Sequence, residues 1–349
     1  MVPECRAEPG PEGELEAFEE GGPEEHVVRL QDEFHTLLSG ARVYAVCARP
    51  QRDDLTRGPA IPLSQDMIDT KKTRTSGVIS LRERGKIAIR GKVLAGVMTA
   101  PQMAAVSRIA EEFGDGTVGL TARLNVELPG IDRRDAGVVA ERLRQAGIEP
   151  GSTGATLRSV VACKGTVCRH GCYDTQGLAR AIEERYGGCD LPRKLKISVA
   201  GCPNNCARVQ LNDIGIMGRR FPLFADECEG CGACEKVCRE GAVRVTDGKV
   251  LFSEEACIGC GDCITICPGE AIGTASEGVR FFLGGRSGRV LRVGTGADDL
   301  VAEEEAVAIV GRLIDCFREN ALPGERLGEM MERVGTGIIF AAAGMRPRE

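Results

Sequence analysis

Cysteine is the residue type whose number and spacing in this sequence could do chemistry. The chain has 349 residues and 17 cysteines, and 14 of these fall between Cys163 and Cys267. The N-terminus lacks the basic start and apolar stretch of a secretory signal, so stable disulfides are not expected. Clustered cysteines in such a chain favour metal or iron–sulfur ligation.

The densest cluster is an internal repeat of two four-cysteine runs. Each run has the spacing C-x2-C-x2-C-x3-C, and the two runs are Cys228, Cys231, Cys234, Cys238 and Cys257, Cys260, Cys263, Cys267. This spacing predicts two [4Fe–4S] clusters, because three close thiolates bind one cluster and the fourth reaches the other. Cluster one would use Cys228, Cys231, Cys234 and Cys267, and cluster two would use Cys257, Cys260, Cys263 and Cys238. A zinc-binding repeat is the alternative, although zinc sites usually pair two C-x2-C units across a longer spacer. The repeat resembles bacterial two-cluster ferredoxins, with Arg239 where a proline is usual.

Four further cysteines form two pairs outside the repeat. Cys163-x4-Cys168 lies in VVACKGTVCRHGC, and Cys202-x3-Cys206 lies in GCPNNC, which LPRKLK precedes. On these motifs the chain resembles the sulfite and nitrite reductase family that couples sirohaem to a [4Fe–4S] cluster, over about residues 78–218 and 279–349. The inserted repeat makes it most similar to the catalytic subunit of anaerobic sulfite reductase and to small dissimilatory-type sulfite reductases.

The resemblance implies a third [4Fe–4S] cluster, held by the two pairs. In the family the last cysteine bridges the cluster and the haem iron, and that role falls to Cys206. The first pair of the family is C-x5-C, whereas this chain has C-x4-C. Either Cys168 or Cys172 therefore completes the set. His170 lies near this loop, where a structural hydrogen bond is its expected role.

Basic residues extend the resemblance to the substrate side. The substrate-side cations of the family match Arg90, Arg158, Lys194 and Lys196. Reducing a small oxyanion at iron needs compensating positive charge and proton donors, which arginine and lysine supply. Alternation along a strand would place Lys194 and Lys196 on one face, with Leu195 toward the core. Arg158 lies five residues before Cys163 and is expected near the same cofactor.

Sirohaem carries many carboxylates, and arginine is well suited to bind them. Arg123 in LTARLN matches a Thr-x-Arg segment of the family, which implies a contact with sirohaem. Arg193 and Arg286 are further candidates for this role. The alternative for each of these cations is an ordinary solvated surface charge.

The pattern of helix-like and strand-like segments around these residues predicts an α+β protein. Strand-like and helix-like segments alternate from Gly85 to Gly147, which indicates a two-layer unit. A second such unit begins near Gly151, and the cysteine repeat interrupts it. The predicted parts are an acidic, partly disordered segment over 1–75, a ferredoxin-like half domain over 76–150, a sirohaem and [4Fe–4S] domain over 151–218 and 279–349, and an inserted two-cluster ferredoxin domain over 219–278. Further helices are predicted at 26–38, from CPNNCARVQ onward, and at about 299–320 and 324–334.

Charge and hydropathy narrow the class of partner. The formal net charge is −6, but residues 1–25 carry nine glutamates and one arginine, so the rest of the chain is slightly basic. Without a long Lys/Arg stripe, no nucleic-acid partner is expected. No apolar run approaches the ~18–20 residues of a membrane helix. A cytoplasmic protein is the expectation.

The expected activity is the six-electron reduction of sulfite to sulfide, with sirohaem and three [4Fe–4S] clusters as cofactors. Reduction of nitrite to ammonia is the near alternative, and a non-catalytic electron-transfer or sirohaem-binding subunit is the alternative from another class. The chain lacks a G-x-G-x-x-G dinucleotide fingerprint, and hydride chemistry would need a flavin before single-electron clusters. A partner flavoprotein, iron–sulfur subunit or ferredoxin is therefore the expected electron donor. Oligomerisation is left open.

Overall fold

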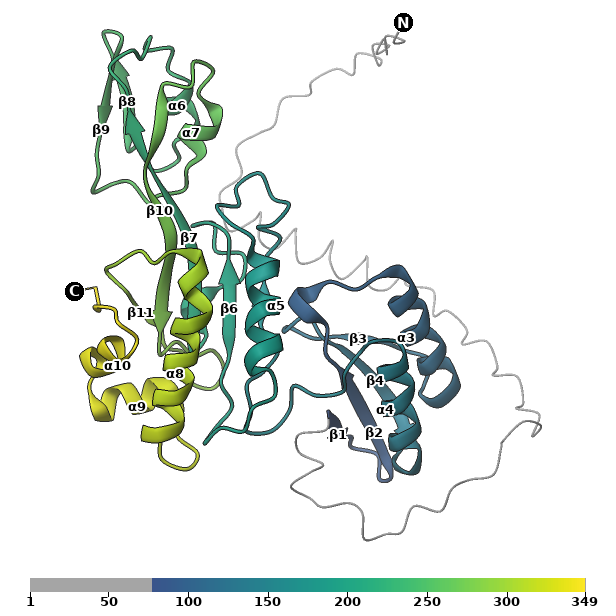
Figure 1. Ribbon diagram of the computed structural model, residues 1–349. Coiled ribbons are helices and arrows are strands. Elements are labelled where there is room, and N and C mark those ends of the chain that lie inside the picture. Colours follow the sequence, from purple (N-terminus) through teal and green to yellow (C-terminus); the bar gives the residue numbers. More distant parts are fainter. Residues whose placement is uncertain (1–76, 349) are drawn as a thin grey trace, which may run out of the picture. The chain divides into compact units, whose positions relative to one another are not determined.

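The computed structural model describes residues 77–348. The predicted acidic segment and the predicted helix over 26–38 lie outside the described residues. The described residues belong to one compact unit. They form a four-stranded, a five-stranded and a two-stranded sheet, with helices on the two larger ones (Figure 1). No helix within 77–348 is long and apolar enough to cross a membrane.

The first sheet is antiparallel, with strand order β1-β2-β4-β3. Its strands are β1 (Val78–Ser80), β2 (Lys86–Gly91), β3 (Gly119–Leu120) and β4 (Val126–Asp132). Two helices share an apolar cluster with the sheet, α3 (Ala100–Phe113) and α4 (Ala136–Gln145). Thr99 and Gln102 cap the start of α3 reciprocally, and Gly114 ends it. The predicted two-layer α+β unit is therefore present.

The second sheet is mixed, with strand order β11-β10-β7-β6-β5. Its strands are β5 (Val161–Ala162), β6 (Ile197–Ala200), β7 (Ile214–Phe224), β10 (Ile272–Leu283) and β11 (Thr295–Gly296). Strands β5, β6 and β7 are parallel, whereas β10 is antiparallel to β7 and to β11. The carboxyl ends of the three parallel strands consequently meet at one edge of the sheet, and their amino ends meet at the other.

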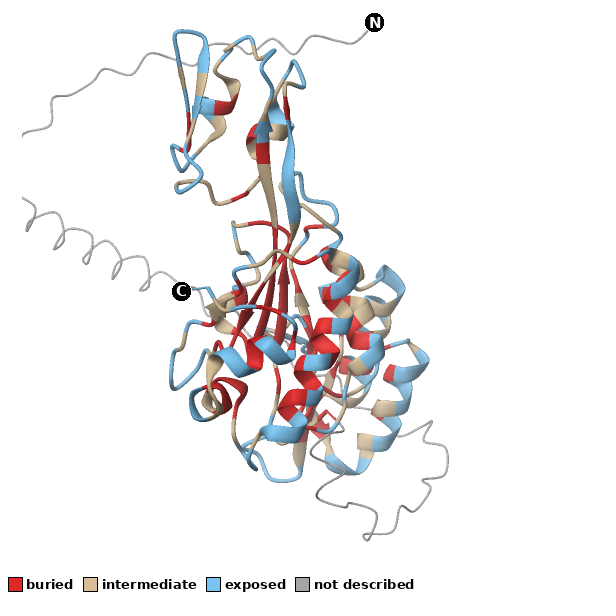
Figure 2. Cartoon of the chain, turned by 60° about the vertical axis from the view of Figure 1, so that its left-hand side comes forward, coloured by how far each residue is buried: buried red, intermediate tan, exposed pale blue. Residues whose placement is uncertain are grey.

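The two faces of this sheet are covered differently. Four helices complete the main core on one face, α5 (Thr175–Tyr186), α8 (Ala306–Asn320), α9 (Leu327–Val334) and α10 (Thr336–Ala342). Val199 and Ile216 belong to that core, while their neighbours Ala200 and Met217 join Val209 in a smaller cluster. This alternation is the period of two expected for strands buried on both faces. Figure 2 shows the buried residues gathered in these strands and in the helix sides that face them.

Strands β7 and β10 extend as a two-stranded ribbon, in which the segments DIGIMG and GVRFFLGG are neighbouring strands. Arg219 pairs with Gly278, and the ribbon continues to Phe224 and Ile272. We call residues 225–271 the insert segment. It contains α6 (Ala233–Val237), β8 (Val243–Thr246), β9 (Lys249–Phe252) and α7 (Asp262–Ile266). Its apolar cluster has only four buried residues, Cys234, Val243, Cys263 and Ile272.

One prediction about helices is wrong, and another differs only in its start. CPNNCARVQ forms turns and a 3-10 turn at Val209–Leu211 rather than the start of an α-helix. Asn205 (φ 52°) and Arg208 (φ 50°) have left-handed backbone, which interrupts a right-handed helix. The helix predicted from residue 299 begins at Ala306, and α10 follows the last predicted helix.

Candidate cofactor and substrate site

The two cysteine pairs outside the repeat lie in loops that follow neighbouring parallel strands. Cys163 comes directly after β5, and Cys202 comes two residues after β6. Because β5 and β6 are paired in parallel, both loops leave the same edge of the sheet. Burial raises the pKa of the Cys202 thiol, and the three other predicted ligands, which lie close by, raise it further. The structure thus places Cys163, Cys168, Cys202 and Cys206 in neighbouring loops, but within 77–348 no three Cys, His, Asp or Glu side chains lie close enough together to bind a metal ion directly.

Backbone contacts hold the two cysteine loops against each other. The N–H of Gly201 donates to Cys163 Sγ at 3.1 Å, and the N–H of Cys172 donates to the carbonyl of Gly201 at 2.9 Å. A Cβ atom at Gly171 would lie 1.9 Å from the carbonyl oxygen of Gly165, so only glycine permits this approach. Backbone N–H groups directed at sulfur are among the contacts by which proteins set the potential of a cluster.

Cys168 and Cys172 have different surroundings. Cys168 is exposed, and its N–H donates to the carbonyl of Lys164 at 2.8 Å in a turn. Cys172 Sγ lies 4.0 Å from the carbonyl oxygen of Cys260 in the insert segment. Burial raises the pKa of Cys172 to about 11, and the nearby Cys202 adds to this effect. Cys168 remains the predicted fourth ligand of the cluster that Cys163, Cys202 and Cys206 would share. Cys172 lies where this loop meets the insert segment.

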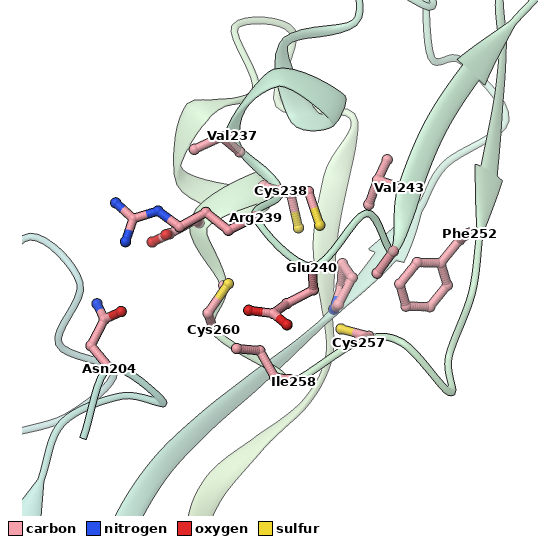
Figure 3. A pocket seen from close by; sticks show the side chains of 15 residues that line it. Asn204, Val237, Cys238, Arg239, Glu240, Val243, Phe252, Cys257, Ile258 and Cys260 are labelled. Atoms are coloured by element: carbon pink, nitrogen blue, oxygen red, sulfur yellow. The ribbon is translucent and has the colours of Figure 1, made fainter. Parts of the chain in front are cut away.

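The eight cysteines of the repeat line two cavities. Cys228, Cys231, Cys234 and Cys267 line the first cavity, and Cys238, Cys257, Cys260 and Cys263 line the second. These are the two sets that the spacing predicts, each with one cysteine from the other run. Figure 3 shows the second cavity, with the sulfur atoms of Cys257 and Cys260 beside it. Burial raises the pKa of Cys263 to about 12, followed by the effect of Cys260 and Cys257. Binding of iron would therefore have to release protons from these thiols.

The predicted substrate cations lie at the opposite edge of the parallel strands. Arg158 precedes β5, and Lys194 and Lys196 precede β6. At about 3.3 Å per residue, an extended chain places Lys196 roughly 16 Å from Gly201. The short sequence distance between Arg158 and Cys163 does not bring them together, because β5 runs between them.

Arg90 and Arg158 converge on one carbonyl group. Arg90 Nη1 donates to the carbonyl oxygen of Ser152 at 2.8 Å, and Arg158 Nη1 donates to the same oxygen. Ser152 holds a left-handed φ of 58°, a strain that is common at functional sites. Arg90 also pairs with Glu127, at 2.5 Å between Nη2 and Oε1. Burial lowers the pKa of Arg158 to about 10, and the charge of Arg90 lowers it further.

Lys194 and Lys196 lie on either side of the fully buried Leu195, as alternation predicts. Burial lowers the pKa of both lysines, and neighbouring arginines lower it further. Among residues 77–348, neither lysine has an ion-pair partner. The edge therefore carries a positive surplus that a bound anion would balance.

A buried ion pair supports this edge, and sequence analysis missed it. Arg326 Nη2 donates to both carboxylate oxygens of Asp213, at 2.8 and 2.6 Å. The N–H of Lys196 donates to Asp213 Oδ2 at 2.8 Å, so the pair also fixes the backbone beside the lysines. The two partners are 113 residues apart in the sequence, and no local motif marks either of them.

The three arginines predicted to bind sirohaem carboxylates differ in their contacts. Arg123 Nη2 donates to the carbonyl oxygens of Ser159 and Ile197, at 2.6 and 2.8 Å, and burial lowers its pKa to about 10. Arg193 is exposed. Arg286 forms an ion pair with Glu329 at 2.6 Å. A sirohaem contact for these arginines stays a prediction.

The residues present fit the cofactors that the sequence implies. Within 77–348, Arg158 Nε, Ser159 Oγ and Ser198 Oγ are buried without a hydrogen-bond partner. Orphaned polar atoms beside unpaired cations fit a polyanionic group such as sirohaem. Four cysteines in two neighbouring loops at one sheet edge are the ligand number and type of a [4Fe–4S] cluster.

Comparison with known proteins decides the family. The model described as nitrite and sulphite reductase 4Fe-4S domain matches residues 153–346, and the nitrite/sulfite reductase ferredoxin-like half domain matches residues 80–146. The chain belongs to the nitrite and sulfite reductase family. It is 33% identical to a subunit of the anaerobic sulfite reductase of Salmonella typhimurium, over 77% of this chain and 86% of that protein.

Two further similarities give the extent of the match. The coenzyme F420-dependent sulfite reductase of Methanocaldococcus jannaschii is 35% identical over 76% of this chain, which spans 43% of that longer protein. The crystal structure of dissimilatory sulfite reductase I has the same fold over 75% of this chain and 69% of that chain, with a TM-score of 0.63 and 20% identity. Membership of the family identifies an oxidoreductase and supports sirohaem with a [4Fe–4S] cluster as cofactors.

Proposed function

We propose that this chain is a sirohaem-dependent sulfite reductase, which converts sulfite to sulfide with six electrons. The observation that carries the proposal is the convergence of the two cysteine pairs at one edge of the parallel strands. Cys163, Cys168, Cys202 and Cys206 would hold the coupled [4Fe–4S] cluster, with Cys206 shared with the haem. Sirohaem, when bound, supplies the iron at which a sulfur oxyanion can be reduced.

The cations at the other edge would handle the anion. Arg90 and Arg158 present fixed guanidinium groups, which suit an oxyanion. Lys194 and Lys196 carry ammonium groups whose lowered pKa makes proton donation easier than from free lysine. These residues would bind the substrate, orient it and supply protons.

The insert segment would relay electrons through two more [4Fe–4S] clusters. The support is that each cavity is lined by the four cysteines that would bind one of the two clusters of such a ferredoxin. An external donor of single electrons, a ferredoxin or a flavoprotein, would reduce these clusters. We expect no direct reduction by NADH or NADPH, because hydride chemistry requires a flavin before one-electron carriers.

The relatives support sulfite over nitrite as the proposed substrate. Two relatives named sulfite reductases match 76% and 77% of this chain, whereas the nitrite reductase large subunit of Klebsiella oxytoca matches 40%. Measuring kcat/KM for both anions with one reduced dye tests this preference. A higher value for nitrite would reverse it.

The direct test uses the full chain purified without oxygen. We expect sirohaem absorption bands, iron for three clusters, and sulfide production from sulfite with a reduced one-electron dye. A chain that takes up no sirohaem in reconstitution would refute the proposal. A non-catalytic subunit would hold sirohaem and pass electrons on, yet form no sulfide.

A further inference from the structure

The two cavities of the insert segment differ in their surroundings. The described residues that line the first cavity all lie between Cys228 and Ile272, within the insert segment or directly after it. The second cavity is also lined by Asn204, from the GCPNNC loop that carries Cys202 and Cys206. Figure 3 shows Asn204 on a separate loop, across from Cys260. We call the two loops that carry Cys163, Cys168, Cys202 and Cys206 the coupled site. The second cavity therefore borders the coupled site directly.

A set of polar contacts holds this border in place. His170 Nδ1 lies 2.7 Å from Asp262 Oδ1, and both side chains are mostly buried. Arg169 Nε donates to His170 Nε2 at 3.1 Å, which leaves Nδ1 to donate to the carboxylate. His170 belongs to the Cys163–Cys172 loop, and Asp262 begins α7 between two cysteines of the second cavity. The hydrogen bond therefore links the ligand loops of two different predicted clusters.

The ribbon adds contacts to the same stretch. The N–H of Arg220 donates to the carbonyl of Gly259 at 2.9 Å, and the Arg219 guanidinium donates to the carbonyl of Ile258. All these contacts end within residues 258–262. The Ile258 and Gly259 contacts use backbone oxygens, so they fix the loop, whereas His170–Asp262 is a bond between side chains that a substitution can remove by itself.

We propose that His170 and Asp262 are positioning residues that hold the second cavity against the coupled site, and that electrons pass to the coupled cluster from this cavity. The first cavity is then the entry point from the external donor. The transfer moves one electron: the cluster in the second cavity is oxidised, the coupled cluster is reduced, and no bond or proton changes place. This inference rests on the proposed function, because it requires clusters in both sites.

The experiment compares His170→Asn with His170→Gln in the full, cluster-loaded chain. The amide nitrogen of asparagine occupies the place of Nδ1 and can still donate to Asp262. The amide nitrogen of glutamine lies where Nε2 was, so the hydrogen bond to Asp262 is lost. After rapid reduction of the insert segment by a ferredoxin in place of a dye, we expect haem reduction to slow at least about tenfold in His170→Gln, the scale of a misplaced group. His170→Asn should stay near the rate of the unchanged chain.

A spectroscopic readout separates positioning from simple loss of structure. The magnetic interaction between the second cluster and the coupled cluster, measured by electron paramagnetic resonance, should weaken in His170→Gln and persist in His170→Asn. Glu277→Ala is the matched control, because it removes an exposed ion pair with Arg220 on the same ribbon and no bond to residues 258–262. It should change neither readout.

Two results would overturn the inference. One is equal electron transfer and equal magnetic interaction in the asparagine and glutamine variants. The other is a magnetic interaction of the coupled cluster with the cluster in the first cavity rather than with the cluster in the second. Cys228→Ser would reveal this, because loss of the first cluster would then abolish the interaction. Failure of the proposed function would look different, because the unchanged chain itself would then take up no sirohaem or form no sulfide.

Discussion

The two edges of the β5–β6–β7 sheet carry different chemistry and are built in different ways. The carboxyl edge gathers thiols from two loops, which neighbouring backbone groups hold together. The amino edge gathers cations from separate segments, and the buried Arg326–Asp213 pair supports them. The same strands position both sets, but the thiols depend on local loop geometry and the cations on long-range packing. A change at one edge should therefore leave the chemistry of the other edge intact.

The largest effect is expected at Cys206. Replacing Cys206 with serine should disturb the spectra of the coupled cluster and the haem together and abolish sulfite reduction, because one sulfur would serve both. Visible and paramagnetic resonance spectra of the reconstituted protein measure this. Haem bands identical to those of the unchanged chain would show that Cys206 does not bridge.

Cys228→Ser provides the comparison within the same chain. Cys228 lines the first cavity, which borders no described residue of the coupled site. Its replacement should leave the haem bands unchanged and lower the rate only with the physiological donor. Dye that reduces the coupled site directly should restore turnover.

The second largest effect is expected at the cation edge. Lys194→Ala combined with Lys196→Ala should lower kcat/KM for sulfite by about 10²–10³-fold, the scale of losing electrostatic stabilisation of a developing charge. Iron and sirohaem contents should not change, because the cysteines lie at the other edge. Loss of the coupled cluster in this variant would contradict the separation of the edges.

The contrast between the edges also explains what the sequence could predict. The cysteine spacing predicted both cavity sets in the insert segment, since three of the four ligands of each cluster lie within one short motif, whereas the set of Cys163, Cys168, Cys202 and Cys206 came from the resemblance to the family. The two-layer unit between Gly85 and Gly147 was predicted because alternating strand-like and helix-like segments are a local signal. The Arg326–Asp213 ion pair was not predicted, because these residues are 113 positions apart in the sequence and only the packing of α9 on the sheet brings them together.

Local strain accounts for the main error in secondary structure. A helix was predicted from CPNNCARVQ onward, but Asn205 and Arg208 adopt left-handed backbone. Asn205 Oδ1 accepts the N–H of Val209 at 2.8 Å and stabilises the turn. Such a turn keeps Cys206 close to Cys202, and its geometry depends on the surrounding loops more than on the intrinsic preferences of these residues.

Removal of iron should affect the insert segment more than the rest of the chain. Two of the four buried residues in its cluster are cysteines predicted to bind iron, so little apolar area is left to hold it folded. We expect chelation to expose residues 225–271 to proteolysis while the two larger sheets stay protected. Protection of the insert segment after complete loss of iron would show that its core suffices without clusters.

The smallest effect is expected in the pH dependence of substrate capture. Burial, then the positive charges of neighbouring arginines, lowers the pKa of Lys194 and Lys196 below the ordinary value for lysine. The lysines bear charge below the lowered pKa and lose it as pH rises through it. The kcat/KM for sulfite, which reports the free enzyme, should therefore decline at a pH where free lysine would still be charged.

A bound anion reverses the direction of this shift. Negative charge beside an ammonium group favours its protonated form, so the pKa of both lysines should rise when sulfite binds. The alkaline decline of kcat should then lie at higher pH than that of kcat/KM. Replacing both lysines with arginine should remove the early decline of kcat/KM, because guanidinium stays charged throughout this range. Superimposable profiles for the lysine and arginine forms would mean that another group controls the alkaline decline.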